Sequence, residues 1–497
     1  FDDPAVYAEI QDADTVGVFQ IESRAQMQSL LQTRPENLDD LTVQVALIRP
    51  GPVSGGAVHP YVRHRRARRR DPAFRPPYDH PLLEPVLEET LGVVVFQEQV
   101  LEVAMALAGF SAGEAEDLRR AMSRKRSRDA MLRMWQRFLQ GARERGVPDE
   151  VTRTVFTKLI GFSNFGFPKA HSAAFAVLAY QSAWLRRHHP AEFLAALINA
   201  QPMGFYPPAS LVRDAGRRGV RTLRTCIRRS EVACTVEDGA VRLGLGMVRG
   251  LGADDAGHVV AERASSGHFT GLTDLMARTS MRPEQAAMLA RAGALDAFGV
   301  PEREILWQAA TIARPRRVAG GAGEQLPLPI DPADAPDLPA PDRIDRVIAE
   351  YDATGVSTGW HLMTLVRPAL PAGTFTADAL KQAQHGTTVT VAGMVVARQR
   401  PATAGGIVFL LLEDETGPIN VIVRPALYES HRAIVRADPL LVVTGRLERR
   451  ERVINVLARD IRSAALPARD PLPLEDSDAA RVRHVVPAAQ DFARGRR

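Results

Sequence analysis

The segment FGFPKAHSAAF, residues 165–175, places a lysine and a histidine where a helix is expected to begin. Gly166 and Pro168 precede them, and an apolar, alanine-rich run follows. The first N–H groups of a helix lack partners within it, and its dipole adds a partial positive charge there. Lys169 and His171 therefore suit an anion-binding site. The simpler alternative is that His171 only caps the helix and Lys169 is solvated.

The elements that would position this site belong to a long, basic chain. It has 497 residues, of which 45% are hydrophobic, and a net charge of +5. Its length predicts about three domains. Arginine outnumbers lysine strongly, which suits a polyanionic partner, although a GC-rich genome also explains this bias. Two cysteines give neither a disulfide framework nor a zinc site, and no apolar run is long enough to span a bilayer. We expect a cytoplasmic protein. The opening FDDPAVYAEI predicts a helix capped by Asp3, and we therefore expect the chain to begin within a larger protein.

Residues 1 to about 310 have mainly helical patterns with short turns. The run GEAEDLRRAM, residues 113–122, predicts a helix with acidic residues in its first turn and arginines behind them. The run YVRHRRARRRDPAFR, residues 61–75, holds seven arginines. We expect a solvated loop there, with contact to phosphate as the alternative.

Four glycines lie close together in VRLGLGMVRGLGADDAGHVVAER, residues 241–263. A dinucleotide-binding fingerprint would need a second strand about 20 residues later, and a helical pattern follows instead. The better fit is a helix-hairpin-helix motif whose hairpin is Arg249 to Gly252. Gly250 and Gly252 would let backbone N–H groups approach a phosphate, and Ala256, Val259 and Val260 would pack the second helix. A plain helical turn is the other alternative.

The remaining third changes in composition twice. Residues 311–345 are rich in Pro, Ala and Gly and predict a linker, within which Gln325, Leu326 and Leu328 form a short apolar peptide that could dock on a partner. Chance apolar residues explain it almost as well. After Gly386 alternating strands predict a barrel of about five strands, of the oligonucleotide-binding (OB) type. Three arginines could line its groove: Arg398, Arg400 and Arg424.

Several long motifs in order resemble the fingers region of bacterial family C DNA polymerases. They are GVFQIES (17–23), ALIRPGP (46–52), GVVVFQEQV (92–100), AGFSAGEAEDLRRAM (108–122) and FGFPKAHSAAFAVLAYQSAWLRRHHPAEF (165–193). The hairpin, the linker peptide and the barrel follow in the family's order, so the resemblance covers nearly the whole chain. NFGFP and EDETGPINVIV, with an early end after the barrel, look most like the error-prone, damage-tolerant branch of this DNA polymerase III alpha-like family.

The resemblance implies a multidomain, mainly α protein followed by a small β-barrel. It also implies that this chain lacks the family's PHP and palm regions. The implied order begins with the fingers at residues 1–220, the helix-hairpin-helix region at 221–310 and a linker with a possible clamp-binding peptide at 311–345. A connector at 346–385, the OB-fold at 386–465 and a C-terminal tail at 466–497 follow.

The implied reaction is template-directed addition of dNTPs in translesion synthesis, which depends mainly on positioning and charge neutralisation. In the family, two Mg²⁺ ions would be held by aspartates of the palm. This sequence has no spaced aspartates in a strand-like segment that resemble the palm motif. No metal site is therefore expected here, and the fragment alone should be inactive. By resemblance, Arg119 and Arg120 grip the dNTP triphosphate, and Lys169 and His171 complete the site. Pro168 replaces an amide side chain of the replicative pattern, which removes one expected contact.

The resemblance also implies primer-template DNA as a partner. Arg249, Gly250 and Gly252 would bind the duplex backbone, and the barrel would lie near the template strand. Gln325, Leu326 and Leu328 resemble a degenerate sliding-clamp peptide in which Pro replaces the aromatic end, so recruitment would depend on accessory translesion proteins. Two other classes stay open: a noncatalytic nucleic-acid-binding protein with hairpin and barrel modules, and a synthetase-like enzyme, for which no ATP-binding signature is found.

Overall fold

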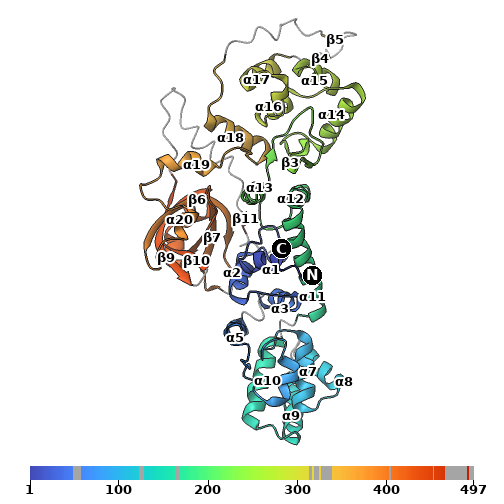
Figure 1. Cartoon of the computed structure of the whole chain (residues 1–497), viewed down its shortest axis with the longest axis vertical. Coiled ribbons are helices and arrows are strands. Elements are labelled where there is room, and N and C mark those ends of the chain that lie inside the picture. Colours follow the sequence, from blue (N-terminus) through green and yellow to red (C-terminus); the bar gives the residue numbers. More distant parts are fainter. Residues whose placement is uncertain are drawn as a thin grey trace. The chain divides into compact units, whose positions relative to one another are not determined.

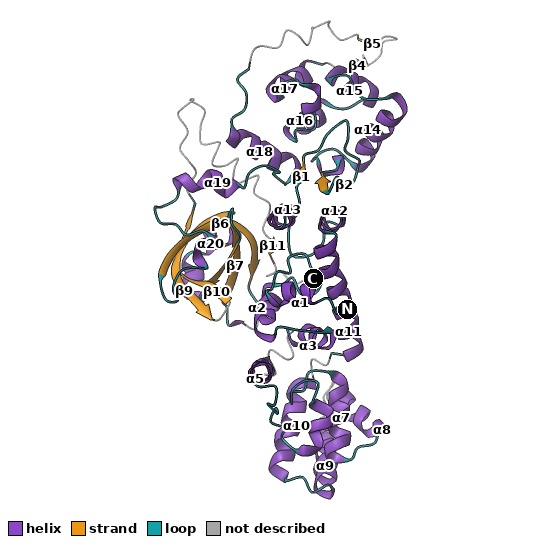
Figure 2. Cartoon of the chain, viewed as in Figure 1, coloured by secondary structure: helices purple, strands orange, loops and turns teal. Residues whose placement is uncertain are grey.

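The computed structural model describes ten stretches of the chain. They are residues 1–48, 58–121, 128–163, 167–312, 316–317, 324–325, 338–401, 404–450, 453–464 and 490–491. The chain divides into two compact units, Phe1–His188 and His189–Arg497. Helices dominate both units, and one strand-rich body lies in the second (Figures 1 and 2). The predicted combination of a mainly helical protein with a small barrel is confirmed.

The first unit is helical throughout its described residues. Its α-helices are α1 (Pro4–Gln11), α2 (Arg24–Thr33), α3 (Leu38–Leu47), α5 (Val58–Arg70), α6 (Glu84–Leu87), α7 (Gln97–Ala108), α8 (Ala112–Ala121), α9 (Arg128–Glu144), α10 (Asp149–Ser163) and α11 (Lys169–His188). The predicted N-cap is confirmed, because the Asp3 carboxylate accepts from the Ala5 N–H.

Two of the clusters of buried side chains in this unit position the predicted site. In the first, α11 packs on α1 and α3 through Ala176, Ala179 and Ala183, whose helical spacing puts small side chains on one face. Small residues let helix backbones approach closely. In the second, α6 to α10 surround the fully buried Phe138 and Leu107. The start of α11 and the end of α8 are each fixed by one of these clusters.

The arginine run forms the helix α5 from Val58 to Arg70, so the predicted loop was wrong for that part. Tyr61 and Val62 are buried, which anchors one side of the helix. Arg65 is also buried, pairs with Asp40, and donates to the Thr33 carbonyl at 3.3 Å. The run therefore folds because some of its arginines bind acids and carbonyls of neighbouring helices, which a charge count does not reveal.

The second unit begins with helices and three short strands. Its elements up to the linker are α12 (Pro190–Asn199), α13 (Pro208–Arg217), β1 (Thr222–Leu223), β2 (Thr235–Glu237), β3 (Ala240–Arg242), the 3₁₀ turn η2 (Leu245–Met247), α14 (Ala253–Ser266), α15 (Leu272–Thr279), α16 (Pro283–Arg291), the 3₁₀ turn η3 (Asp296–Phe298) and α17 (Glu302–Thr311).

Within the predicted linker, β4 (Arg316–Arg317) pairs antiparallel with β5 (Glu324–Gln325). The chain then forms α18 (Arg343–Thr354), α19 (Leu362–Val366) and α20 (Ala377–Leu380). Leu326 and Leu328 of the possible clamp peptide lie outside the described residues, as does the Gln325 side chain. The clamp peptide and the six domain boundaries therefore stay predictions.

The barrel is built from β6 (Thr388–Gln399), β7 (Val408–Glu413), β8 (Pro418–Val423), β9 (Leu440–Arg450) and β10 (Val453–Ser463). The strands lie in the order β6-β7-β8-β10-β9, and β6 also pairs with β9, which closes a five-stranded barrel as predicted. The helices α21 (Pro425–Ser430) and α22 (Arg432–Ala437) lie between β8 and β9 in sequence. The short strand β11 (Gln490–Asp491) pairs parallel with β6.

Gly141→Ala is expected to destabilise the first unit, because a Cβ at this position of α9 would lie 1.9 Å from the Ala108 carbonyl oxygen. We expect a loss of about 2 kcal/mol or more in the free energy of unfolding. Gly113→Ala is the matched control: its added Cβ meets nothing within 4 Å in α8, so the helix should gain about 0.5 to 1 kcal/mol. Urea denaturation measures both, and equal effects would contradict the close packing of α9.

Candidate nucleotide and nucleic-acid interface

The start of α11 lies beside the start of α7, and an acidic side chain already binds it. The Phe167 carbonyl accepts from the Gln97 N–H at 3.0 Å, which joins the two helix starts. The Lys169 N–H donates to the Glu98 carboxylate at 2.9 Å, and Lys169 Nζ lies 2.5 Å from Glu89. The helix start thus binds a negative group, as the dipole and free N–H groups require.

These acids also set the charge of the lysine. The hydrogen bond from Lys169 to Glu89 raises the pKa of the ammonium, so Lys169 is cationic at neutral pH. Burial raises the pKa of Glu102, and the neighbouring Glu89 adds to this rise. The start of α11 therefore combines the Lys169 cation with carboxylates from two places: Glu89, which precedes α7, and Glu98 and Glu102 of α7.

His171 lies in the first turn of α11, and its ring meets two phenylalanines. The His171 ring centroid lies 4.9 Å from that of Phe167 and 4.2 Å from that of Phe175, both in edge-to-face geometry. His171 is exposed and, among the described residues, forms no hydrogen bond. The capping alternative is therefore not what the structure shows: aromatic contacts orient the ring, and its nitrogens remain open to a ligand.

Arg119 and Arg120 lie in the last turn of α8 and both bind Glu116. Arg119 donates from Nε at 2.7 Å and from Nη2 at 2.5 Å, and Arg120 Nε donates at 3.1 Å. Their side chains are 34% and 70% exposed, so solvent and a ligand can reach them. The hydrogen bonds from Arg119 lower the pKa of Glu116 to about 2. Glu116 occupies the place that an anionic ligand would take.

The structure brings the predicted cations together as two pairs. Lys169 and His171 share the first turn of α11, and Arg119 and Arg120 share the last turn of α8. Lys169 pairs with Glu89 and the arginines pair with Glu116. That all four converge on one triphosphate stays a prediction.

Sequence reasoning missed the acids that occupy these sites. The spacing of Glu116 to Arg119 and Arg120, three and four residues, could have revealed the first, because such pairs face each other on a helix. No sequence signal identifies Glu98, which lies 71 residues before Lys169.

The predicted hairpin has the expected geometry. Gly250 has φ of +78°, a conformation that favours glycine. Its carbonyl accepts from Gln285 Nε2 at 3.2 Å, and the Arg249 N–H donates to the Ala353 carbonyl at 2.8 Å. Within the described residues, the N–H groups of Gly250 and Gly252 have no partner. The hairpin is thus held from both sides with two donors left open.

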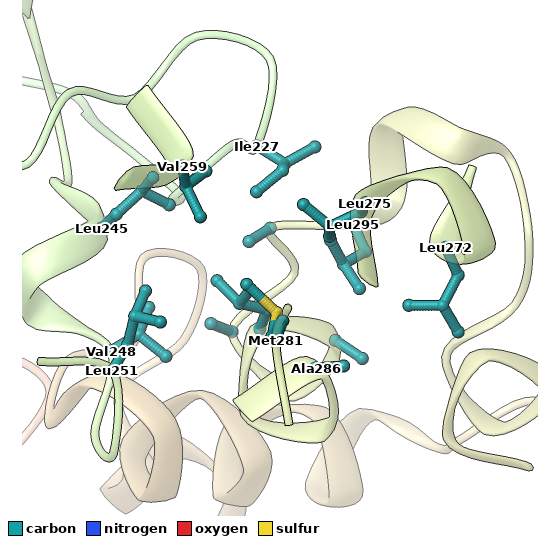
Figure 3. Close-up of a cluster of buried hydrophobic side chains, with 14 of the residues drawn as sticks. Ile227, Leu245, Val248, Leu251, Val259, Leu272, Leu275, Met281, Ala286 and Leu295 are labelled. Carbon is teal, nitrogen blue, oxygen red and sulfur yellow. The ribbon is translucent and has the colours of Figure 1, made fainter. Parts of the chain in front are cut away.

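The second helix of this motif is α14, which packs as predicted. Ala256 and Val259 are fully buried and Val260 packs against the same core. Figure 3 shows Val259 with Val248 and Leu251 in this cluster. Gly252 is the N-cap residue of α14, so its N–H lies at the positive end of that helix.

The three barrel arginines have different environments. Arg398 donates to the Val435 carbonyl at 2.7 Å and the Asp438 carbonyl at 2.5 Å, so it fastens the segment around α22 rather than lining a groove. The Arg400 guanidinium stacks over the Tyr428 ring at 4.6 Å from its centroid. Arg424 is exposed just before α21. Only the last two remain open to a nucleic acid.

Two further properties follow from the described residues. None of their helices is long and apolar enough to cross a membrane. They also hold no cluster of three His, Cys, Asp or Glu side chains that could bind a metal.

Three family models match successive parts of the chain. The bacterial DNA polymerase III alpha subunit finger domain matches residues 1–146, a helix-hairpin-helix motif matches 219–305, and an OB-fold nucleic acid binding domain matches 389–464. These matches agree with the helical first unit, the hairpin before α14 and the closed barrel. The class they define is a nucleic-acid-binding protein of the polymerase type.

Curated relatives extend this similarity over most of the chain. The Error-prone DNA polymerase of Mycobacterium bovis is 46% identical over 92% of this chain, and that of Burkholderia pseudomallei is 45% identical over 89%. The chain covers 41% and 42% of those proteins. An asparaginyl-tRNA synthetase structure from Pyrococcus horikoshii covers 23% of this chain and 29% of its own at 18% identity and a TM-score of 0.17, too low to indicate a shared fold. Over most of its length the chain is therefore similar to bacterial DNA polymerase III alpha-like proteins, and it spans about two fifths of the length of these relatives.

Proposed function

We propose that this chain supplies the dNTP and DNA contacts of an error-prone DNA polymerase that performs translesion synthesis. The observation that carries the proposal is the pair of arginines at the end of α8, one half-buried and one exposed, which already hold a carboxylate through three hydrogen bonds. Both lie within the residues matched by the finger domain. Relatives named error-prone DNA polymerase support the damage-tolerant activity.

The chemistry asks little covalent work of these residues. In nucleotidyl transfer the protein positions the triphosphate and neutralises its charge while pyrophosphate leaves. Arg119 and Arg120 would exchange the Glu116 carboxylate for phosphate oxygens, because guanidinium binds both anions in the same bidentate geometry. Lys169 and His171 would add an ammonium group and an imidazole ring at the start of α11.

Mg²⁺ would activate the primer 3′-hydroxyl and stabilise the leaving oxygens. Its aspartate ligands would come from the remaining three fifths of a full-length enzyme, since this chain spans 41% of its relatives. The chain alone is therefore expected to be inactive.

Primer extension tests the proposed function. The chain alone should add no dNTP to a primer-template. The same chain joined to the remaining part of a related error-prone polymerase should extend the primer, past an abasic template site as well as on undamaged DNA. Primer extension by the chain alone would contradict the proposal that the metal-binding aspartates lie in the rest of the enzyme. A completed enzyme that stops at every lesion would contradict translesion synthesis.

The hairpin would bind the backbone of the primer-template duplex. The open N–H groups of Gly250 and Gly252 and the Arg249 side chain, which is 49% exposed, are its donors. Asp254 and Asp255 follow in the first turn of α14, so the binding must rely on these directed donors rather than on net charge. Such a contact would be independent of sequence and would weaken with salt.

Gly250→Ala should weaken duplex binding by the chain about tenfold, because a methyl group at the hairpin tip blocks the approach of a phosphate to donors worth about 1.5 to 3 kcal/mol. Gly239→Ala is the matched control. Gly239 lies in the turn between β2 and β3, and its φ of +73° is similar to the +78° of Gly250. Both variants carry the same backbone strain of about 1 to 2 kcal/mol. Fluorescence anisotropy with a labelled duplex at several salt concentrations measures the difference. Equal losses in the two variants would remove the hairpin from the DNA site.

A further inference from the structure

Three neighbouring cavities of the second unit share lining residues, and together they are called the groove here. The first, of about 630 Å³, is lined by α13, the loop 357–361 and the turn after β7. It shares Gly359 and Trp360 with a cavity of about 420 Å³. That cavity in turn shares Arg224, Pro341, Arg346 and Glu350 with a third of about 410 Å³ beside α16. The groove therefore extends from the turn after β7 past Trp360 to the end of α16.

The groove carries an excess of free positive charge. Most of its acids are neutralised inside the fold: Glu350 pairs with Arg224, and Glu413 pairs with Arg213. Arg221, Arg343 and Arg346 also line it, are exposed, and form no ion pair among the described residues. Free arginines along a groove fit a partner with repeated negative charges.

An exposed tryptophan, Trp360, lines two of the three cavities. Trp360 is 44% exposed, and the Arg343 guanidinium lies over its ring at 4.2 Å from the centroid. When a cation covers one face of a tryptophan ring, the other face can stack on a further planar group.

The loop that carries Trp360 is held in place before any ligand binds. Glu350 accepts from the Ser357 hydroxyl at 2.7 Å and from the Thr358 N–H at 3.2 Å. Glu350 itself is buried and pairs with Arg224. The exposed ring is therefore positioned by a buried acid, so binding to it costs little ordering of the loop.

We propose that this groove binds single-stranded nucleic acid, with a base stacked on Trp360 and the backbone phosphates on Arg221, Arg343 and Arg346. A fixed aromatic ring among arginines is the arrangement that binds single strands without sequence preference. In a duplex the base faces are covered by neighbouring pairs, so they do not reach a ring inside a groove. This site lies in the second unit, and its occupation does not depend on the proposed dNTP site or on nucleotide addition.

Binding of an oligothymidylate to the whole 497-residue chain tests the proposal. A strand of about 12 nucleotides is compared with a strand of equal length whose central sugars carry no base. Trp360→Ala should weaken binding of the oligothymidylate about tenfold and leave binding of the abasic strand unchanged. Trp360→Phe, which keeps a stacking ring, should bind nearly as the parent does. Trp184→Ala is the matched control, because Trp184 is 37% exposed on α11 of the other unit.

The arginines are tested on the same two strands. Arg221→Ala with Arg346→Ala should weaken both strands and reduce the salt dependence by about 0.7 for each lost phosphate contact. Arg153→Ala, an exposed arginine of α10, should leave both unchanged. The proposal fails if Trp360→Ala keeps full affinity for the oligothymidylate or loses affinity equally for both strands. It also fails if polyglutamate competes as well as the oligothymidylate, since an acidic peptide would then be the better partner. Thermal unfolding of each variant verifies that it is folded.

Discussion

Alanine at both Arg119 and Arg120 is expected to raise the apparent KM for dNTPs at least tenfold, in the enzyme made by joining this chain to the remaining part of a related error-prone polymerase. Tenfold corresponds to about 1.4 kcal/mol of lost binding. The reason is that a triphosphate needs several fixed cations, and these two guanidinium groups are solvent-accessible, adjacent and already oriented by Glu116. Steady-state kinetics at saturating primer-template measures the KM, and anisotropy measures the DNA affinity, which should change little.

Two companion variants sharpen this result. Arg143→Ala removes the same charge from α9, where Arg143 is 59% exposed and pairs with Asp149 at 2.5 Å, and it should leave the KM unchanged. Glu116→Gln removes the competing carboxylate, which is ionised at neutral pH because its pKa is about 2, so the KM should fall. An unchanged KM in the double arginine variant, or a rise with Glu116→Gln, would remove the end of α8 from the nucleotide site.

Glu413→Gln is expected to lower the free energy of unfolding of the second unit by about 3 to 5 kcal/mol. Glu413, at the end of β7, is 6% exposed and accepts from Arg213 Nε at 2.8 Å and Nη2 at 2.6 Å. The Ser210 hydroxyl donates to it at 2.8 Å. An amide leaves the buried Arg213 charge without its partner, which costs more than the lost hydrogen bonds. Urea denaturation followed by circular dichroism measures the change.

The control for this pair replaces both charges. Arg213→Met with Glu413→Leu should recover most of the stability, because the desolvation of both ions is then avoided. Asp149→Asn, which breaks the exposed pair with Arg143, should have little effect. A small effect of Glu413→Gln alone would show that water reaches Arg213, contrary to the packing of α13 on the barrel.

The same pair predicts a pH dependence. Burial by itself would raise the pKa of Glu413, but the charge and hydrogen bonds of Arg213 outweigh burial and hold the pKa below its ordinary value of 4.5. Since the folded pKa lies below the unfolded one, the stabilisation is complete above about pH 4.5 and is lost as the pH falls below it. The Glu413→Gln variant should lack this part of the acid dependence.

Local patterns were sufficient to predict several elements. The helix from Lys169 follows from Pro168 before it and the apolar period after it, and the barrel follows from alternating strands with short turns. The hairpin at Gly250 follows from glycines at a site that needs positive φ. The arginine run failed as a predicted loop, because Arg65 is stabilised by Asp40, which lies on a different helix.

The sequence by itself determined which residues can carry positive charge and on which elements they lie, because helix starts, turns and strand alternation depend on neighbouring residues. The tertiary structure alone decided which acids meet them: Glu98 reaches the Lys169 N–H across 71 residues, and Glu413 meets Arg213 across 200. It also decided that Trp360 lies in one groove with Arg221 and Arg346. These juxtapositions come from the burial of apolar faces between distant helices and the barrel, and such packing leaves no local period in the sequence.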